Sequence, residues 1–224
     1  MTRPLVIRDL GLIAYEAAYD EQKQLVAAKR SDEHLPDYLL LLEHPEVYTH
    51  GRKSKPEEIP NNAVEIERGG QATYHNPGQL VGYPILRMEP GHRDLHRYLR
   101  WLEDRLIAVL MQFGIAAGRR EGATGVWVEE GARKIASIGV AVSGWVTYHG
   151  FALNVCNDLS GFQRIQPCGF DSRVMTSMLQ SLGKAHCPPM DAVKAAVRQE
   201  FASFSWMGGQ PFWETTDLGS TAYV

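Results

Sequence analysis

The chain has 224 residues, of which 44% are hydrophobic and 22% charged, and its formal net charge is −3. This length and apolar content suit one large folded domain, so a single domain is expected over residues 1–224. The nearly balanced charge gives no support for nucleic acid or an anionic membrane as a partner. No apolar run approaches the roughly 20 residues that cross a bilayer, and the first residues lack the pattern of a signal peptide.

The N-terminal third alternates between extended and helical patterns. Leu5–Ile7 predicts a short strand, and the apolar spacing of Leu12–Ala28 predicts a helix. The continuous apolar run Tyr38–Leu42 is typical of a buried strand. Lysines, prolines and paired asparagines predict a loop over Arg52–Asn62, and the glycine-rich stretch Ala63–Met88 is predicted to be irregular.

The rest of the chain predicts helices that flank hairpin-linked strands. Asp94 can cap a helix that runs to Phe113, and Gly114 can end it. The predicted strands are Gly125–Val128, Lys134–Val142 and Trp145–Val155, and the later helices are Met175–Leu182 and Asp191–Phe204. Hairpin connections favour an α/β (α+β) fold in which helices pack on a mixed, largely antiparallel sheet.

The stretch RGGQATYHNPGQLVGYP, Arg68–Pro84, combines flexible and polar residues. Its four glycines let a ligand approach the main chain, and its polar side chains can hydrogen-bond a ligand. An elaborate turn between strands is the commoner reason for such a composition. No Gly-Lys-Ser/Thr follows the glycines and the spacing is not that of a dinucleotide-binding loop, so no nucleotide site is predicted.

Two later predicted strands each contain a polar residue of interest. In ARKIASIGV, Lys134 precedes the small residues Ser137 and Gly139, which leave room for a ligand. A lysine in this position usually lies on the surface, but a partly buried one can exchange protons near neutrality. In HGFALNV, His149 precedes alternating apolar residues, where a structural histidine is the commoner outcome.

The three cysteines, Cys156, Cys168 and Cys187, show no CxxC spacing. Their odd number argues against a disulfide framework, and reduced thiols in a cytoplasmic location are expected. In IQPCG, Pro167 and Gly169 flank Cys168 and can present its side chain at a corner. Because free cysteines usually act as small hydrophobes, this local pattern alone does not favour a nucleophile.

Taken together and in this order, the four stretches RGGQATYHNPGQLVGYP, ARKIASIGV, HGFALNV and IQPCG resemble the lipoyl (octanoyl) transferase family. The resemblance extends over about Leu39–Leu182, and VYTHGRKS also fits it. It implies a fold similar to the catalytic domains of biotin and lipoate protein ligases. It also implies an acyltransferase of lipoate biosynthesis, an octanoyl-[acyl-carrier-protein]:protein N-octanoyltransferase.

The resemblance implies site residues as well. The positions that match the family's catalytic pair are Cys168 and Lys134. The substrate-binding positions that it implies are Arg68, Gly69, Gly70, Gln71, Ala72, Thr73, Tyr74, His75, Ser137, Ile138, Gly139, His149, Gly150, Phe151 and Ala152. Backbone amides of Gly69, Gly70 or Gly169 are candidate donors to an oxyanion.

The implied reaction moves an octanoyl group between two carrier proteins. The donor would be the thioester of octanoyl-acyl carrier protein, and the acceptor a lysine of a 2-oxoacid dehydrogenase lipoyl domain or of the glycine cleavage H protein. No cofactor and no metal are expected, and the enzyme is expected to be a monomer. The resemblance also implies that both partner domains are acidic. Basic clusters are candidate contacts for them, although solvated surface charge is the commoner role of such clusters. The clusters contain Arg52, Lys53, Lys55, Arg93, Arg97, Arg100, Arg119 and Arg120.

Two other functions stay open at the level of sequence. An ATP-dependent lipoate or biotin protein ligase would have the same fold and no cysteine nucleophile. A non-catalytic acyl-binding or lipoyl-domain-binding protein would bind without turnover. A zinc site from His75, His149 and Cys168 is allowed by residue type, but no ligand spacing supports it.

Overall fold

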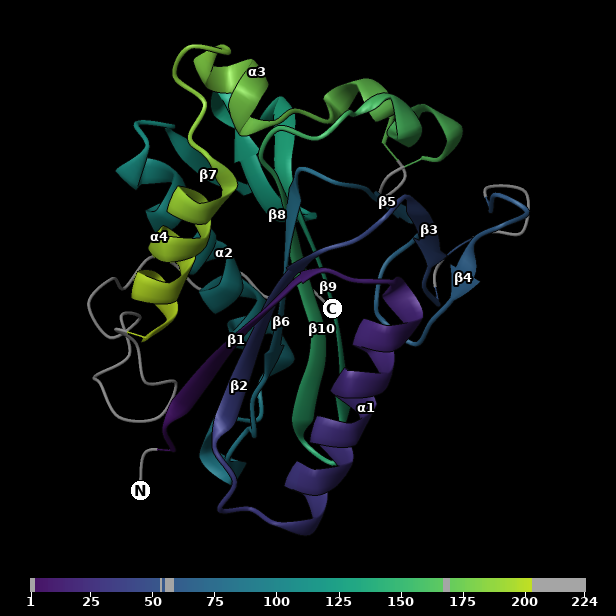
Figure 1. Cartoon of the computed structure of the whole chain (residues 1–224), viewed down its shortest axis with the longest axis vertical. Helices are drawn as coiled ribbons and strands as arrows, with labels where there is room; N and C mark the ends of the chain where they lie inside the picture. Colours follow the sequence, from purple (N-terminus) through teal and green to yellow (C-terminus); the bar gives the residue numbers. More distant parts are fainter. Residues whose placement is uncertain (1–2, 53, 55–58, 167–169, 203–224) are drawn as a thin grey trace.

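The computed structural model describes residues 3–52, 54, 59–166 and 170–202, which form two sheets with helices packed on the larger one (Figure 1). The larger sheet has seven strands, and β1 and β2 are parallel whereas the other neighbouring pairs are antiparallel. The predicted α/β class with a mixed, largely antiparallel sheet is therefore confirmed. The spatial order is β1 (Leu5–Leu12), β2 (Asp37–Glu43), β6 (Gln79–Ile85), β10 (Val146–Asn154), β9 (Arg133–Ser143), β8 (Ala123–Val128) and β7 (Ala117–Arg120).

The smaller sheet has three strands and lies beyond one end of the helix α1 in Figure 1. Its order is β4 (Val64–Glu65), β3 (Val47–His50) and β5 (Thr73–His75). Short 3₁₀ turns cover Pro90–His92, Glu129–Gly131, Ser160–Arg164 and Ser172–Val174.

The helices cover both faces of the larger sheet, so its middle strands are buried on each side (Figure 1). On one face α1 (Tyr15–Ser31) packs Ala18 and Val26 against β2 and β6. On the other face α2 (Leu95–Gln112) and α4 (Met190–Ala202) build the larger core cluster. The short helix α3 (Met178–Leu182) follows the last 3₁₀ turn.

Helix α2 shows why local sequence signals succeed here. The side chain of Asp94 accepts a hydrogen bond from the Arg97 amide at 3.1 Å, which satisfies one of the first-turn donors. Gly114 follows the helix with φ +75, a conformation that glycine adopts without cost. Both boundaries of this predicted helix are confirmed within one residue.

Two predicted boundaries in the first half of the chain are wrong. Leu12 ends β1, where it pairs with Glu43, and the helix begins at Tyr15. The apolar spacing of Leu12 fits the helix pattern. In the structure, however, β1 bends at Gly11, which has φ +62, and Leu12 still pairs with β2. The stretch Ala63–Met88 is also not irregular, because it contains β4, β5 and β6.

Strand β6 is the important omission, since all seven of its residues are buried. It lies between β2 and β10 in the centre of the sheet, with Pro84 opposite Leu39. Glycine and proline are unusual in such a strand, which is why the sequence pattern did not predict it. Strands β3 and β7 were not predicted either, α3 begins at Met178 rather than Met175, and α4 covers Met190–Ala202 rather than Asp191–Phe204.

The predicted hairpin strands are confirmed as β8, β9 and β10. Gly144 and Trp145 make the turn between β9 and β10 with φ of +57 and +62, as expected of a two-residue turn that matches sheet twist. The pairing places Gly150 opposite Gly139 and Ala152 opposite Ser137. Small residues from the two strands therefore lie side by side at the centre of the sheet.

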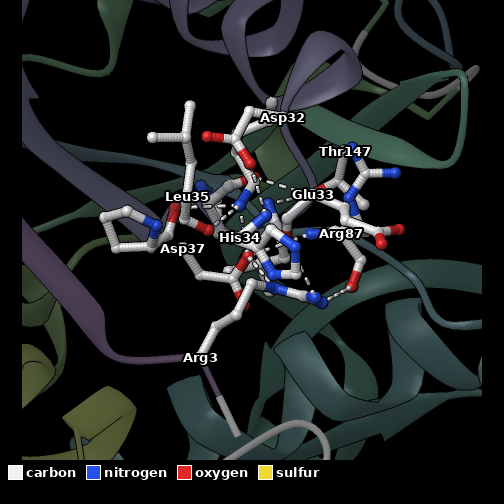
Figure 2. Close-up of polar contacts among 12 residues, drawn as sticks. Arg3, Asp32, Glu33, His34, Leu35, Asp37, Arg87 and Thr147 are labelled. Atoms are coloured by element: carbon white, nitrogen blue, oxygen red, sulfur yellow. Dashed lines mark hydrogen bonds and ion pairs between the residues drawn. The ribbon is translucent and has the colours of Figure 1, made fainter. Parts of the chain in front are cut away.

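Buried charges join the N-terminal segment to the connection between α1 and β2 (Figure 2). The Lys29 ammonium, fully buried, lies 2.9 Å from Asp37 Oδ1 and donates to the carbonyls of Leu35 and Pro36. Arg3 contacts the same carboxylate and donates to the Arg87 carbonyl at 3.1 Å. The attraction between the paired charges and their hydrogen bonds offset part of the free energy that each group loses when it leaves water.

Within the described part of the chain, no helix has the length and apolar content needed to cross a bilayer.

Candidate functional site

A pocket is formed by the loop before β5, by β5 itself, by three strands of the larger sheet and by the start of α1. The space between its walls is about 560 Å³, a volume that includes open solvent at the mouth. Its lining residues are Tyr15, Arg68, Gly69, Gly70, Gln71, Ala72, Thr73, His75, Tyr83, Ser137, Ile138, Gly139, His149, Gly150, Phe151 and Ala152.

The structure thus brings together three predicted groups from distant parts of the sequence. All of the substrate-binding positions implied by the resemblance line this pocket except Tyr74. Alternation along β5 directs Tyr74 away, and its ring packs 4.8 Å from Tyr48 and 5.6 Å from Phe162. Tyr74 therefore belongs to a small hydrophobic core that includes Tyr48 and Phe162, and not to the pocket wall.

Two lining residues, Tyr15 and Tyr83, were not predicted. Tyr15 belongs to the apolar face of α1 and Tyr83 to the apolar pattern of β6. Each therefore has the sequence signature of an ordinary core residue. The signal that could have identified them is that both are phenols, which usually have a hydrogen-bond partner when buried.

Arg68 supplies a buried cation to the pocket wall. Its guanidinium donates to the Thr49 carbonyl and hydroxyl, each at 3.1 Å, and to the Gly69 carbonyl. A Cβ at Gly139 would lie 3.0 Å from Arg68 Cδ, so this glycine leaves the space that the arginine stem occupies. The loop and β9 are thereby packed directly against each other.

The Gly69 amide donates to the Val140 carbonyl at 3.0 Å. The hydrogen of this amide, a candidate oxyanion donor, is thus used to tie the loop to β9. Gly169, another candidate for that role, lies outside the described residues.

His149 has the most unusual backbone of the pocket residues. Its φ is +55 in the middle of β10, and its amide donates to Gln22 Oε1 of α1 at 2.8 Å. The ring stacks on Tyr19 with 5.5 Å between centroids. Its Nε2 is buried and has no hydrogen-bond partner among the described residues. Strained backbone of this kind is concentrated at functional sites.

Burial keeps the pocket histidines neutral. It lowers the pKa of His75 to about 3, with a further contribution from the neighbouring His44 ring, and it lowers the pKa of His149 to about 3, where the Arg68 charge adds to the effect. His75 Nδ1 lies 2.6 Å from Gln79 Oε1, an acceptor, so Nδ1 carries the proton and Nε2 is left as an acceptor.

The floor of the pocket includes Phe151, whose ring lies over Gly82. A Cβ at Gly82 would be 2.2 Å from Phe151 Cζ, so no larger residue fits there without moving the ring. The same ring contacts Phe201 of α4, with 5.6 Å between centroids.

Lys134 does not line this pocket but is fully buried at the start of β9. Its ammonium lies 5.4 Å from the Trp127 ring centroid, a distance at which a cation is attracted to an aromatic face. A Cβ at Gly125 would lie 2.6 Å from Lys134 Cε and 3.2 Å from Nζ. The Gly125 amide is in turn held by Glu103 Oε1 at 2.9 Å.

Hydrogen bonds link the pocket to the lysine. Gln79, the partner of His75, donates to Asn154 Oδ1, and Asn154 donates to the Thr176 carbonyl. The Thr176 amide donates to the Lys134 carbonyl at 2.9 Å. One buried polar chain therefore runs from β5 across β6 and β10 to the start of β9.

Cys168, the predicted nucleophile, lies outside the described residues. Phe170, two positions later, has its ring 5.4 Å from that of Trp127 in an edge-to-face arrangement. Trp127 is therefore next to both Lys134 and the chain that follows Cys168. The other cysteines contribute to neither place, and burial raises the pKa of both thiols.

Among the described residues, no group of three or more histidine, cysteine, aspartate or glutamate side chains is arranged to hold a metal ion. The basic residues considered as partner contacts are partly used within the fold: Arg100 and Arg119 both contact the buried carboxylate of Glu103.

The sequence matches one protein family over most of its length. Residues 14–202 match the family described as the lipoyl protein ligase A/B catalytic domain. The chain is 50% identical over 206 residues to an octanoyltransferase from Syntrophotalea carbinolica, covering 90% of this chain and 95% of that relative. It is 47% identical over 216 residues to an octanoyltransferase from Geobacter metallireducens, covering 95% and 99%.

Solved structures share the fold at low sequence identity. One is a putative lipoate protein ligase from T. acidophilum with bound lipoic acid, with a TM-score of 0.65, 15% identity, and coverage of 91% of this chain and 86% of that one. Another is a biotin protein ligase from Aquifex aeolicus in complex with biotin and ATP, with a TM-score of 0.53, 10% identity, and coverage of 89% and 69%. The predicted similarity to the catalytic domains of such ligases is confirmed for the fold.

Proposed function

The chain belongs to the lipoyl protein ligase A/B catalytic domain family as an acyltransferase of the octanoyltransferase type, and we propose that it transfers octanoyl from acyl carrier protein to a lipoyl-domain lysine. The observation that carries the proposal is the buried Lys134, which lies beside Trp127 and next to the pocket-lining strands. The acceptors are the lipoyl domains of 2-oxoacid dehydrogenases and the glycine cleavage H protein. The enzyme works as a monomer in the cytoplasm.

Cys168 is the nucleophile of the first step. A thiol with an ordinary pKa of about 8.5 is only a few per cent ionised at neutral pH. The ammonium of Lys134 favours the thiolate, which attacks the carbonyl carbon of the donor thioester. The tetrahedral intermediate expels the carrier thiolate, which takes a proton from Lys134. The products are the Cys168 octanoyl thioester and the carrier thiol.

Lys134 is the base of the second step. It is neutral after the first step, because its proton has passed to the carrier thiolate, and a neutral lysine can act as a general base. The acceptor amine attacks the acyl-enzyme and loses a proton to Lys134, while Cys168 leaves as a thiolate. The amide product forms, and the thiolate and ammonium are restored.

The pocket holds the acyl chain. Gly139, Gly150 and Ala152 provide a floor of small residues with Phe151 beside them. Burying about seven carbon groups at about 0.8 kcal/mol each favours a medium-length chain, before the cost of ordering it. His75 and His149 orient groups in the pocket, because burial lowers the pKa of both to about 3 and neither changes its charge near pH 7.

The test is the intact mass of the enzyme after incubation with octanoyl-acyl carrier protein. The wild type should gain one octanoyl group, and Cys168→Ser should gain none. Cys156→Ser is the matched control, since Cys156 is exposed and lies outside the pocket lining, and it should acylate like the wild type. Lys134→Ala should lose transfer to a lipoyl domain.

Two results would contradict the proposal. A wild type without an adduct, together with full activity of Cys168→Ser, would remove the covalent route. Transfer that requires ATP and free octanoate would instead indicate a ligase, the alternative that shares this fold.

A further inference from the structure

Trp127 lies at the junction of three elements around Lys134. Its indole is buried in β8, and its Nε1 donates to the Ala123 carbonyl at 3.1 Å, which fixes the ring orientation. The Lys134 ammonium lies 5.4 Å from its centroid, and the Phe170 ring lies 5.4 Å away at an interplanar angle of 78°. The ring is thus a common neighbour of the proposed base and of Phe170.

Arg120, at the end of β7, contacts both aromatic rings. Its guanidinium carbon lies 4.8 Å from the centroid of Trp127 and 4.7 Å from that of Phe170. Its Nη1 donates to the Gly131 carbonyl at 3.3 Å, which limits its rotation. A planar guanidinium can stack on an aromatic face in a way that an ammonium cannot.

We propose that Arg120 is a positioning residue for the acyl transfer. Its guanidinium joins the Phe170 ring to the Trp127 ring and so fixes the position of Phe170, two residues after Cys168, relative to Lys134. Phe170 is partly exposed and belongs to no helix or strand. Its ring contacts with Arg120 and Trp127 are therefore its main restraints among those observed. Arg120 acts through Phe170 and does not touch the reacting atoms.

The inference rests on the proposed function, because it takes Cys168 as the nucleophile and Lys134 as its partner. Its consequence is measurable at the thiol. The proposal predicts that release of Phe170 weakens the effect of the lysine cation on the Cys168 thiol, so that thiolate formation shifts to higher pH. A misplacement of about 1 Å can cost about 100-fold in rate.

The experiment measures alkylation of each cysteine by iodoacetamide from pH 5.5 to 9.5, followed peptide by peptide with mass spectrometry. Cys156 is exposed and serves as the internal reference in every sample. In Arg120→Ala we expect the midpoint for Cys168 to rise by about one pH unit, which is roughly a tenfold slower reaction at pH 7. The midpoint for Cys156 should stay unchanged.

Three further variants separate position from charge. Phe170→Leu carries the same charge as the wild type, yet it should raise the Cys168 midpoint as Arg120→Ala does. Phe170→Tyr keeps an aromatic ring at this position and should have the wild-type midpoint for Cys168. Arg173→Ala removes a surface cation close in sequence, paired with Asp171 and exposed, and should change nothing. Single-turnover acylation by octanoyl-acyl carrier protein should follow the same order.

The outcomes distinguish the two levels of the proposal. Wild-type midpoints and acylation rates in Arg120→Ala and Phe170→Leu would overturn the role of Arg120 and leave the proposed function intact. A wild type that never acylates at Cys168 would overturn the proposed function and the positioning role with it. Should Arg120→Ala fail to fold, Phe170→Leu tests the same contact from its other side, since Phe170 is partly exposed and belongs to no helix or strand.

Discussion

At the scale of single residues, the identity of a glycine is decided by its spatial neighbours. Gly125 has φ +130, and its Cβ would lie 2.6 Å from both Lys134 Cε and the Ala136 carbonyl oxygen. The motif glycines and Lys134 could be predicted because family resemblance marks them. Tyr15 and Tyr83 could not, because an aromatic residue on an apolar face has the same pattern as a core residue.

A matched pair of variants tests the importance of Gly125. In Gly125→Ala the new methyl group would displace the Lys134 side chain, and we expect octanoyl transfer to fall by about 100-fold. Gly122→Ala is the control, because Gly122 also has positive φ, +70, but nothing lies within 4 Å of its Cβ position. It should cost about 1 kcal/mol of stability through backbone strain and leave the rate within about threefold. Equal rates for the two variants would contradict the account of Lys134, and urea unfolding would show the backbone cost.

At the scale of elements, those with local signals were predictable and those that depend on distant partners were not. Helix α2 has a cap, an apolar stripe and a terminating glycine, so its ends could be predicted. In strand β6, position 82 is a glycine because the Phe151 ring lies over it. Pro84 of the same strand lies opposite Leu39 of β2. Those requirements come from β10 and β2, which are distant in sequence, and the local pattern of β6 therefore indicates a loop.

The connection between α1 and β2 supplies a prediction about stability. Asp37→Asn would leave the fully buried Lys29 ammonium without its counter-ion, and removing one partner of a buried pair costs about 3 kcal/mol. Asp20→Asn is the control, since its pair with Lys23 is exposed and should be worth less than about 0.5 kcal/mol. The measurement is the free energy of unfolding in urea at pH 7. A loss for Asp37→Asn as small as that of the control would show that the pair is not important for stability.

At the scale of the whole molecule, the pocket joins the two sheets and buries neutral histidines between them. Burial lowers the pKa of His75 and of His149 from an ordinary 6.5 to about 3. In the unfolded chain both bind protons near pH 6.5, whereas in the fold they do so only near pH 3. Stability that is complete above pH 6.5 is therefore lost as the pH falls from 6.5 towards 3.

The expected loss approaches about 1.4 kcal/mol per pH unit for each histidine below its unfolded pKa, and it is roughly 2 kcal/mol for both between pH 6.5 and 5.5. Urea unfolding at closely spaced pH values would measure this slope. His149→Gln and His75→Gln should each reduce it, although burial also lowers the pKa of His44 and part of the slope remains, whereas His96→Gln, at an exposed position on α2, should not alter it. A slope that is the same in all four proteins would place the acid sensitivity elsewhere.

Phe151 lines the pocket, and its ring packs in the larger core cluster, where it contacts Phe201 of α4. At this point one residue therefore lies between the pocket and α4. Under the proposed function, repacking of a helix that does not line the pocket can change the substrate length that the pocket accepts. A change at Phe201 that lets the ring tilt would deepen the pocket while every lining residue keeps its identity.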